Sequence, residues 1–334
     1  MALNASGPIA LAGSTAGVSI ALELSLGATT AITLNDAAVR TLAGVSSGAI
    51  VMPTNFYGKS NNPFVQPTIG LMGGLSQCGY MTRVNACRNQ VGSIQNIAGM
   101  GQLPGGARVG VNAVFYGGYK GAYINNVVRV NTSGVKVGST TNVGTARYGQ
   151  AGAQVGVNGL YYGGSTGCAL TNIVTRINAC GALVGSQTNV GNTGYFGGAG
   201  TGNTGIFGSG TKVTRINACG AIIGSISTIA YNANGSGAFI GSAATYYYNL
   251  GVTRLNVCGA VLSASTIAGF SGVSSGSARV GTIGIWAYNC NTTCCCSPNW
   301  DNGVTGINAC GALVGANTYL YGISGGSSAT GAGI

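Results

Sequence analysis

Acidic residues and histidine are almost missing from this chain. Its 334 residues include three acids, Glu23, Asp36 and Asp301, and no histidine. Most hydrolytic and general acid–base chemistry needs paired carboxylates or an imidazole. The composition therefore predicts a protein that is not an enzyme and that uses no metal and no cofactor.

Charge and long apolar runs are also scarce. Charged residues make up 5% of the chain, against about 25% in ordinary soluble proteins. The 14 Lys and Arg residues occur singly, whereas nucleic-acid binders usually cluster their cations, so we expect no nucleic-acid partner. The net charge of +11 mainly favours solubility, and a weak attraction to anionic glycans stays open. No stretch reaches the roughly 20 apolar residues of a membrane helix.

Glycine is abundant, at 62 positions, and it accompanies an internal repeat. The block from Val174 to Ser186 returns at 213–225, 252–263 and 304–315, with weaker copies at 81–93 and 127–139. One position of the block, which we call the repeat arginine, holds Arg83, Arg129, Arg176, Arg215, Arg254 and, in the last copy, Gly306. The spacing of about 40–50 residues is that of a four-stranded propeller blade.

The interior of one period predicts four strands. Residues 127–130 and 135–139 are rich in β-branched side chains and flank Asn131-Thr-Ser-Gly134, a turn sequence. Residues 149–157 are mostly small, as a strand near a crowded axis requires. Asn158-Gly159 predicts a hairpin turn that leads into the aromatic strand 160–164.

These elements resemble a kelch repeat. The resemblance rests on Gly163-Gly164, Asn172, Val174, Arg176, Arg147-Tyr-Gly149 and Asn158-Gly159, and Gly117-Gly118 repeats part of it. The late tryptophan and the acidic turn residue of that family are missing. The resemblance covers about four fifths of the chain, and it implies a β-propeller without implying an activity.

Ring closure can be predicted from the two ends of the repeat region. The last copy lacks an aromatic Gly-Gly strand, which occurs instead before the first copy at 69–74, while residues 325–333 can supply an innermost strand. Joining them closes the sheet edges of a ring. We therefore expect an all-β fold, with a six-bladed kelch-like propeller over residues 64–334. A fibrous β-solenoid is the alternative.

Residues 1–63 do not share the repeat and are expected to form a small β module, with strands near 31–34, 39–42 and 50–52. The segments Gly7–Ser14, Ile32–Asp36, Arg40–Gly44 and Asn55–Ser60 resemble the N-terminal segment of bacteriophage tail proteins. This resemblance implies a virion tail protein, made in the host cytoplasm, that is homo-oligomeric and docks on other tail proteins through residues 1–63. A cellular propeller with an unrelated leader is the alternative.

The eleven cysteines fall into two groups, and Cys78 and Cys168 belong to neither. Five occupy one turn position of the repeat, where the second copy has Ser133, so we interpret them as free thiols: Cys87, Cys180, Cys219, Cys258 and Cys310. After Cys87 the turn glycine is replaced by Arg88, and we expect that turn to differ. A second group, Cys290, Cys294, Cys295 and Cys296, could form disulfides in its loop or with Cys78 or Cys168. Its spacing does not match a structural zinc site.

Variable loops predict a recognition surface at one end of the blades. Exposed aromatic side chains can stack on sugars, and arginine forks bind carboxylate or phosphate. The candidate receptor-binding residues are Tyr119, Tyr123, Tyr246, Tyr247, Tyr248, Tyr288, Trp300, Arg108, Arg147 and Arg279. Packing between blades is the other interpretation of these side chains.

The sequence favours a phage tail fibre or baseplate-associated adhesin that binds a host surface glycan or receptor. A purely architectural virion protein of the baseplate, collar or capsid surface is the alternative. An enzyme is disfavoured, because kelch-type oxidases need histidine ligands and a glycosidase needs two nearby carboxylates, whereas the repeat region contains Asp301 alone.

Overall fold

The computed structural model describes residues 3–4, 6–15, 18–24, 26–43, 45, 47–56, 68–73, 79–167, 169–195, 197–228, 236–248, 251–266, 273–289, 302–315, 318–320 and 330–333. The chain forms two compact units, Met1–Val65 and Gln66–Ile334. The boundary expected after residue 63 lies two residues before this division. Within these described ranges, no helix has both the length and the apolar character needed to cross a bilayer.

The N-terminal unit is built on short helices, which corrects the expected β module. It contains α1 (Ile20–Glu23), α2 (Ala37–Ala43) and the 3-10 helix η1 (Thr54–Phe56). The segment expected as a strand over 39–42 lies inside α2, while 31–33 and 50–51 are irregular. Helix prevails because apolar side chains three and four residues apart share one buried face, as Val39, Leu42 and Ala43 do.

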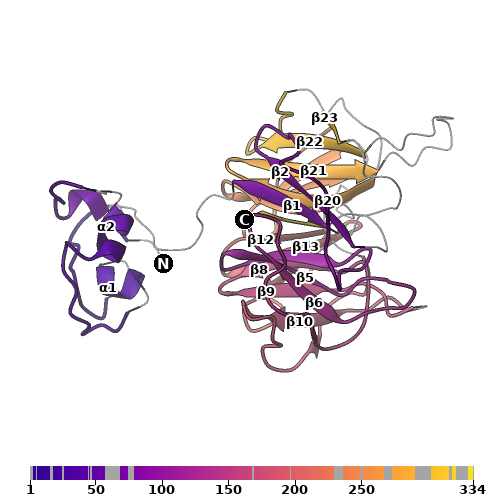
Figure 1. Ribbon diagram of the computed structural model, residues 1–334, viewed down its shortest axis with the longest axis horizontal. Helices are drawn as coiled ribbons and strands as arrows, with labels where there is room; N and C mark the ends of the chain where they lie inside the picture. The colour runs from indigo at the N-terminus through magenta and orange to yellow at the C-terminus, as the bar shows by residue number, and fades with distance from the viewer. Residues whose placement is uncertain are drawn as a thin grey trace. The chain divides into compact units, whose positions relative to one another are not determined.

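The second unit consists of six four-stranded antiparallel sheets, which we number as blades 1 to 6 (Figure 1). From the innermost strand outward, blades 1 to 3 are β24 (Thr330–Gly333), β1 (Ile69–Gly73), β2 (Tyr80–Asn85), β3 (Gln95–Asn96); β4 (Gly105–Val109), β5 (Asn112–Tyr116), β6 (Asn126–Val130), β7 (Thr141–Asn142); and β8 (Ala151–Val155), β9 (Asn158–Tyr162), β10 (Ile173–Ile177), β11 (Thr188–Asn189).

Blades 4 to 6 repeat the same order. They are β12 (Gly197–Gly200), β13 (Thr204–Ser209), β14 (Lys212–Asn217), β15 (Ser227–Thr228); β16 (Gly237–Ile240), β17 (Ala243–Tyr248), β18 (Gly251–Leu255), β19 (Val261–Thr266); and β20 (Val273–Val280), β21 (Ile283–Asn289), β22 (Asn302–Asn308), β23 (Thr318–Leu320). The six innermost strands contact one another in a ring, in the order β24, β4, β8, β12, β16, β20. The fold is a six-bladed β-propeller, as the repeat predicts.

Blade 1 is closed by the end of the chain. Strand β24 pairs antiparallel with β1, with Gly333 opposite Gly70 and Thr330 opposite Gly73. The predicted pairing of the segment near residue 70 with the chain's last residues is confirmed. Because the pairing fills the innermost place of blade 1, the ring closes through backbone hydrogen bonds between segments about 260 residues apart in sequence.

Two local predictions are wrong by a few residues. The hairpin of blade 3 turns at Gly156-Val157, with Val155 opposite Asn158, so Asn158-Gly159 lies in a strand. Gly156 has φ +59°, and glycine at the first turn position gives the type II′ geometry that suits a twisted hairpin. The outermost strand of blade 2 is the two-residue β7. Residues 135–139, expected as a strand, form only one isolated β-bridge, between Lys136 and Val130.

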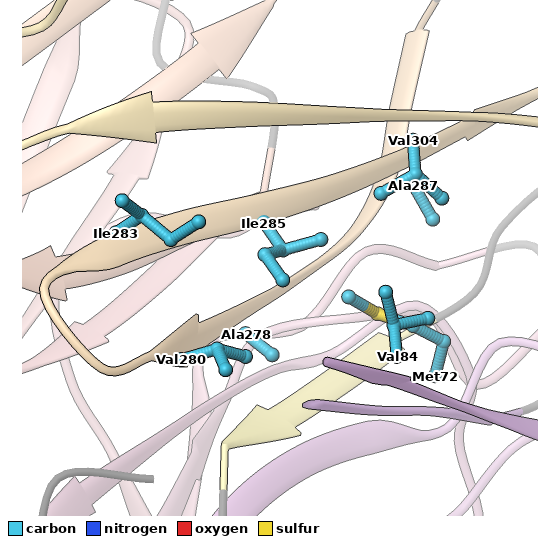
Figure 2. Close-up of a cluster of buried hydrophobic side chains, with 8 residues drawn as sticks. All are labelled: Met72, Val84, Ala278, Val280, Ile283, Ile285, Ala287 and Val304. Carbon is cyan, nitrogen blue, oxygen red and sulfur yellow. The ribbon is translucent and has the colours of Figure 1, made fainter. Parts of the chain in front are cut away.

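A separate hydrophobic core fills each boundary between neighbouring blades. Figure 2 shows the core at the closure, where Met72 and Val84 of blade 1 face Val280, Ile285 and other side chains of blade 6. Met72, Val84, Val280 and Ile285 are fully buried, and each contributes about 1.5–3 kcal/mol by leaving water. The closing boundary is therefore packed as well as hydrogen-bonded.

The repeat arginines join each blade to the next. The guanidinium of Arg129 donates from Nη1 to the carbonyl of Ala179 in blade 3, over 3.4 Å. A Cβ at Gly181 of that same turn would lie 3.5 Å from Cδ of Arg129. Arg83 lies in the same way over Gly134 of blade 2. Glycine in the turn thus leaves room for the arginine stem of the preceding blade.

At the boundary between blades 6 and 1, arginine and glycine exchange places: glycine holds the repeat position and arginine holds the turn position. The repeat position of blade 6 is Gly306, and Arg88 occupies the turn position of blade 1. A Cβ at Gly306 would lie 3.0 Å from Cδ of Arg88, so the arginine stem enters this boundary from the turn. Contrary to the sequence expectation, the turn itself is unchanged, because Arg88 adopts φ +65° and its N–H donates to Asn85 over 2.8 Å.

Candidate functional site

The antiparallel order of the strands gives every blade two different ends. One end, the loop face, carries the connections from second to third strand and from the fourth strand to the next blade. The opposite end, the hairpin face, carries the inner hairpins and the Asn-x-x-Gly turns. Long connections occur on the loop face, such as residues 117–125 and 163–172.

Four tyrosines from three blades meet on the loop face, and we call them the tyrosine cluster: Tyr119, Tyr123, Tyr148 and Tyr195. The rings of Tyr123 and Tyr148 stack with their centroids 5.3 Å apart and an interplanar angle of 20°. Tyr119 contacts Tyr123 at 5.5 Å, and Tyr195 contacts Tyr148 at 5.9 Å. The four rings form one continuous aromatic surface.

Backbone hydrogen bonds hold the loops that carry these rings. Tyr119 and Gln102 exchange two N–H···O bonds of 2.8 and 2.9 Å, and Tyr148 and Ser165 exchange two of 3.0 and 2.9 Å. Gly149 has φ +67°, and a Cβ there would lie 2.7 Å from the ring of Tyr195. Glycine is therefore required both for the backbone conformation and for the approach of that ring.

The outer side of the cluster is open to solvent. Tyr123 is 37% exposed and Tyr195 is 42% exposed. The hydroxyl of Tyr195 donates to the hydroxyl of Tyr148 over 2.8 Å. Partial burial, together with Tyr148, raises the pKa of Tyr195 to about 12, so this phenol stays neutral at pH 7. The cluster therefore leaves two rings partly exposed at the surface, with a neutral hydroxyl beside them.

Arg147, a candidate recognition residue, lies beneath this surface and is fully buried. Its guanidinium donates to the carbonyl of Ile173 over 2.6 Å, to the carbonyl of Tyr161 over 3.1 Å and to Oγ1 of Thr175 over 2.8 Å. Burial lowers its pKa to about 10. Arg147 is therefore not an exposed receptor-binding residue, and the other interpretation, packing within the propeller, holds for it; its hydrogen bonds tie the loop to blade 3.

Arg108 and Arg279 are also placed differently from expectation. Both lie one residue before the end of an innermost strand, next to the hairpin glycines Gly110 and Gly281. They are therefore near the hairpin face, whereas the connection that holds Arg147 is on the loop face. The three arginine candidates therefore do not share one end of the blades.

The aromatic candidates of blades 5 and 6 do not form a described exposed surface. Tyr246 and Tyr247 are fully buried, and the hydroxyl of Tyr246 donates to the carbonyl of Ile206 in blade 4 over 2.8 Å. Their prediction as exposed loop residues is wrong, because β17 extends through them. The side chains of Tyr248 and Tyr288 lie outside the described residues, as do Trp300 and the cysteines at 290 and 294–296.

The remaining cysteine interpretation agrees with the structure. The turn thiols are free and exposed: Cys87, Cys180, Cys219, Cys258 and Cys310. In four of these turns the asparagine Oδ1 accepts the cysteine N–H, as Asn178 does from Cys180 over 3.0 Å. Among the described residues, no three His, Cys, Asp or Glu side chains gather in a way that could hold a metal ion.

Sequence reasoning found half of the tyrosine cluster. Tyr119 and Tyr123 were candidates, whereas Tyr148 and Tyr195 were missed. A sequence signal for these two residues exists. In blades 3 and 4 an aromatic residue stands just before the innermost strand. Chemically, the cluster can stack on a sugar ring or another flat group and can accept or donate hydrogen bonds at its edge.

Comparisons with known proteins find structural likeness at low sequence identity. No protein-family model matches the chain, and no curated protein matches it in sequence. A functionally unknown protein from Desulfotomaculum acetoxidans is similar in structure at 15% identity and a TM-score of 0.48, over 79% of this chain and 86% of that one. A protein of unknown function from Bacteroides caccae has 11% identity and a TM-score of 0.48, over 79% and 98%. The Pan2 WD40 domain of Neurospora crassa has 8% identity and a TM-score of 0.44, over 66% and 65%.

Proposed function

We propose that this chain is a non-enzymatic phage virion protein that binds a host surface glycan through the tyrosine cluster. The observation that carries the proposal is the continuous surface of four tyrosine rings, two of them more than a third exposed. Aromatic faces bind the apolar faces of sugars, and the phenol edges supply hydrogen bonds. The N-terminal segments that resemble phage tail proteins support a place in the tail.

The test is glycan binding by the full chain at pH 7, measured by saturation-transfer NMR with polysaccharide from candidate host cells. We expect Tyr123→Ala or Tyr195→Ala to weaken binding about tenfold, since about 1.4 kcal/mol corresponds to a factor of ten. Tyr80→Ala is the matched control, because Tyr80 is 41% exposed on blade 1 outside the cluster.

Two outcomes would contradict this proposal. One is equal binding by wild type and by both cluster variants, which would move recognition to another surface. The other is no binding to any surface polysaccharide of a host that the intact particle infects.

An architectural role in the particle is the second candidate, and one observation favours it. Val111 and Val157 at the hairpin tips are 73% and 79% exposed, and exposed apolar side chains on one face can mark a protein contact. Immunogold labelling of assembled particles separates the two roles. An internal or collar position favours architecture, and a distal position favours adhesion.

A further inference from the structure

The two units of the chain differ in charge. The unit Gln66–Ile334 holds twelve of the 14 Lys and Arg residues and one of the three acids, which gives it a net charge of +11. In Met1–Val65, two basic and two acidic residues cancel. The one acid of the propeller unit, Asp301, lies outside the described residues, so no described carboxylate accompanies its basic side chains. A ligand of the propeller therefore meets a positive potential, which attracts anions.

Two of these positive charges are exposed on the loop face. The repeat arginines pack against turns of the hairpin face, as Arg129 does by donating to the carbonyl of Ala179, and Arg147 is fully buried. Lys120 of blade 2 and Lys212 of blade 4 are exposed on the loop face. Lys212 begins the third strand of its blade, whereas Lys120 lies in a loop that carries the tyrosine cluster.

Lys120 lies between two tyrosines of the cluster. Tyr119 and Tyr123 form a β-bridge with their ring centroids 5.5 Å apart, and the N–H of Lys120 donates to the carbonyl of Ala122 over 2.9 Å. A Cβ at Gly121 would meet nothing within 4 Å, so the tip of this turn faces open space. The ammonium group is thus carried on a flexible four-carbon stem that starts one residue away from a ring of the cluster.

An ammonium group beside an aromatic surface distinguishes charged sugars from neutral ones. A neutral sugar gains from stacking and from hydroxyl hydrogen bonds, whereas an acidic sugar gains an ion pair as well. We propose that the tyrosine cluster and Lys120 together select an acidic polysaccharide, with a carboxylate or a phosphate on its sugar units. An ammonium acts as a point charge, so it accepts either group. This inference rests on the proposed function and names the class of glycan that the same surface takes.

Two pairs of polymers that differ only in charge test the selectivity. One pair is polygalacturonate and its carboxyl-reduced form, and the other is phosphomannan and its dephosphorylated form. Binding of the full chain to each immobilised polymer is measured by biolayer interferometry at low and at high salt. We expect the acidic member of at least one pair to bind about fivefold more tightly at low salt, and salt to reduce this difference by screening exposed charges. The pair that shows the preference identifies the anionic group.

Variants of Lys120 separate its local effect from the net charge of the propeller. Lys120→Gln should weaken binding of the acidic polymer about fivefold and leave binding of its neutral form unchanged, while Lys120→Arg should keep most of the affinity. Lys136→Gln is the matched control, because it removes the same charge near the hairpin end of the same blade, where Nζ of Lys136 donates to Oγ1 of Thr140 over 2.6 Å. It should leave binding unchanged.

The inference is overturned if neither pair shows a preference for its acidic member. It is also overturned if Lys120→Gln and Lys136→Gln lose equal affinity, because net charge alone would then account for the attraction. In both cases, binding of host polysaccharide that still depends on Tyr123 leaves the proposed function standing. Absence of binding to every polysaccharide overturns the proposed function and this inference together.

Discussion

The exchange of arginine and glycine at the closing boundary predicts a strong coupling between two residues far apart in sequence. Arg88 in the turn of blade 1 lies where a repeat arginine at Gly306 would otherwise lie. Its Nη2 would be 2.7 Å from a Cβ at Gly315, and Arg215 has the same relation to Gly224 in blade 4, also at 2.7 Å. One guanidinium position is thus filled from either side of the boundary.

The single substitutions should differ in cost. Gly306→Arg places a second arginine stem where a Cβ already meets Arg88 at 3.0 Å, and overpacking of this kind costs about 1–3 kcal/mol. Arg88→Gly loses the packing of about two methylenes, about 1.6 kcal/mol, but relieves a left-handed backbone that costs about 1–2 kcal/mol in a residue with a Cβ. We therefore expect Arg88→Gly to stay within about 1 kcal/mol of wild type.

The double variant Arg88→Gly/Gly306→Arg should recover most of the loss. It recreates the arrangement of the other boundaries, so the coupling energy should be about 2 kcal/mol, within the range for residues in contact. Urea unfolding of the four proteins, followed by tryptophan fluorescence, measures it. Both tryptophans of the chain lie in the propeller unit, so the signal reports that unit.

Gly134→Arg provides the control, because Gly134 holds the turn position over Arg83 at another boundary. Combined with Arg88→Gly it should show additive losses, since the two sites share no contact. The reasoning is refuted if Arg88→Gly and Gly306→Arg are also additive, because the two residues would then not compete for one place.

Three further predictions concern burial and exposure. Arg147→Met should destabilise the propeller by about 3 kcal/mol or more, measured by urea unfolding, because three carbonyl or hydroxyl acceptors lose a charged donor; a change below 1 kcal/mol would contradict it. Burial raises the pKa of Tyr162 to about 12 and that of Tyr246 further. Between pH 10 and 12 the unfolded chain therefore releases phenolic protons that the folded chain keeps, and the free energy of unfolding should fall as pH rises. The lowered pKa values of Arg108, Arg147 and Arg279 act the other way, but more groups are raised, since burial also raises the pKa of Tyr116, Tyr161, Tyr195 and Tyr247. A thiol reagent should label at least five cysteines in the native protein without a lag; slow labelling that follows unfolding would count against their exposure. Cys180→Ser should leave the thermal midpoint within about 1 °C, because Ser133 fills the same turn position.

The repeat, the blade number and the closure followed from local patterns. Strand pairing and tight turns depend on neighbours in sequence, so β-branched runs and turn glycines mark them directly. The last copy of the repeat lacks one strand, and the segment before the first copy contains one strand too many. The two irregularities match, and they predict the closure. Turn positions do not follow from such patterns alone, because Gly156-Val157 and Asn158-Gly159 are both good hairpin sequences, and the pairing of β8 with β9 selects the first.

The N-terminal unit and the candidate site were harder to predict. Alternation and helical spacing overlap in a short apolar segment, and packing of Val39 against the rest of that unit's core favours the helix. The burial of Tyr246 and Tyr247 was also hidden, since an aromatic pair before a loop looks the same whether or not its strand continues.

The sequence by itself determined which strands the propeller has, because turn conformations and strand propensities are local requirements of residue type and spacing. It also determined how the ring closes, because the last copy of the repeat lacks a strand that the segment before the first copy supplies. Tertiary structure alone decided that Tyr148 and Tyr195 join Tyr123, and that Arg88 takes the place of an arginine missing more than two hundred residues away. Those contacts depend on how neighbouring blades are placed side by side around the axis, and side-chain packing across such boundaries leaves no periodic pattern in a single chain.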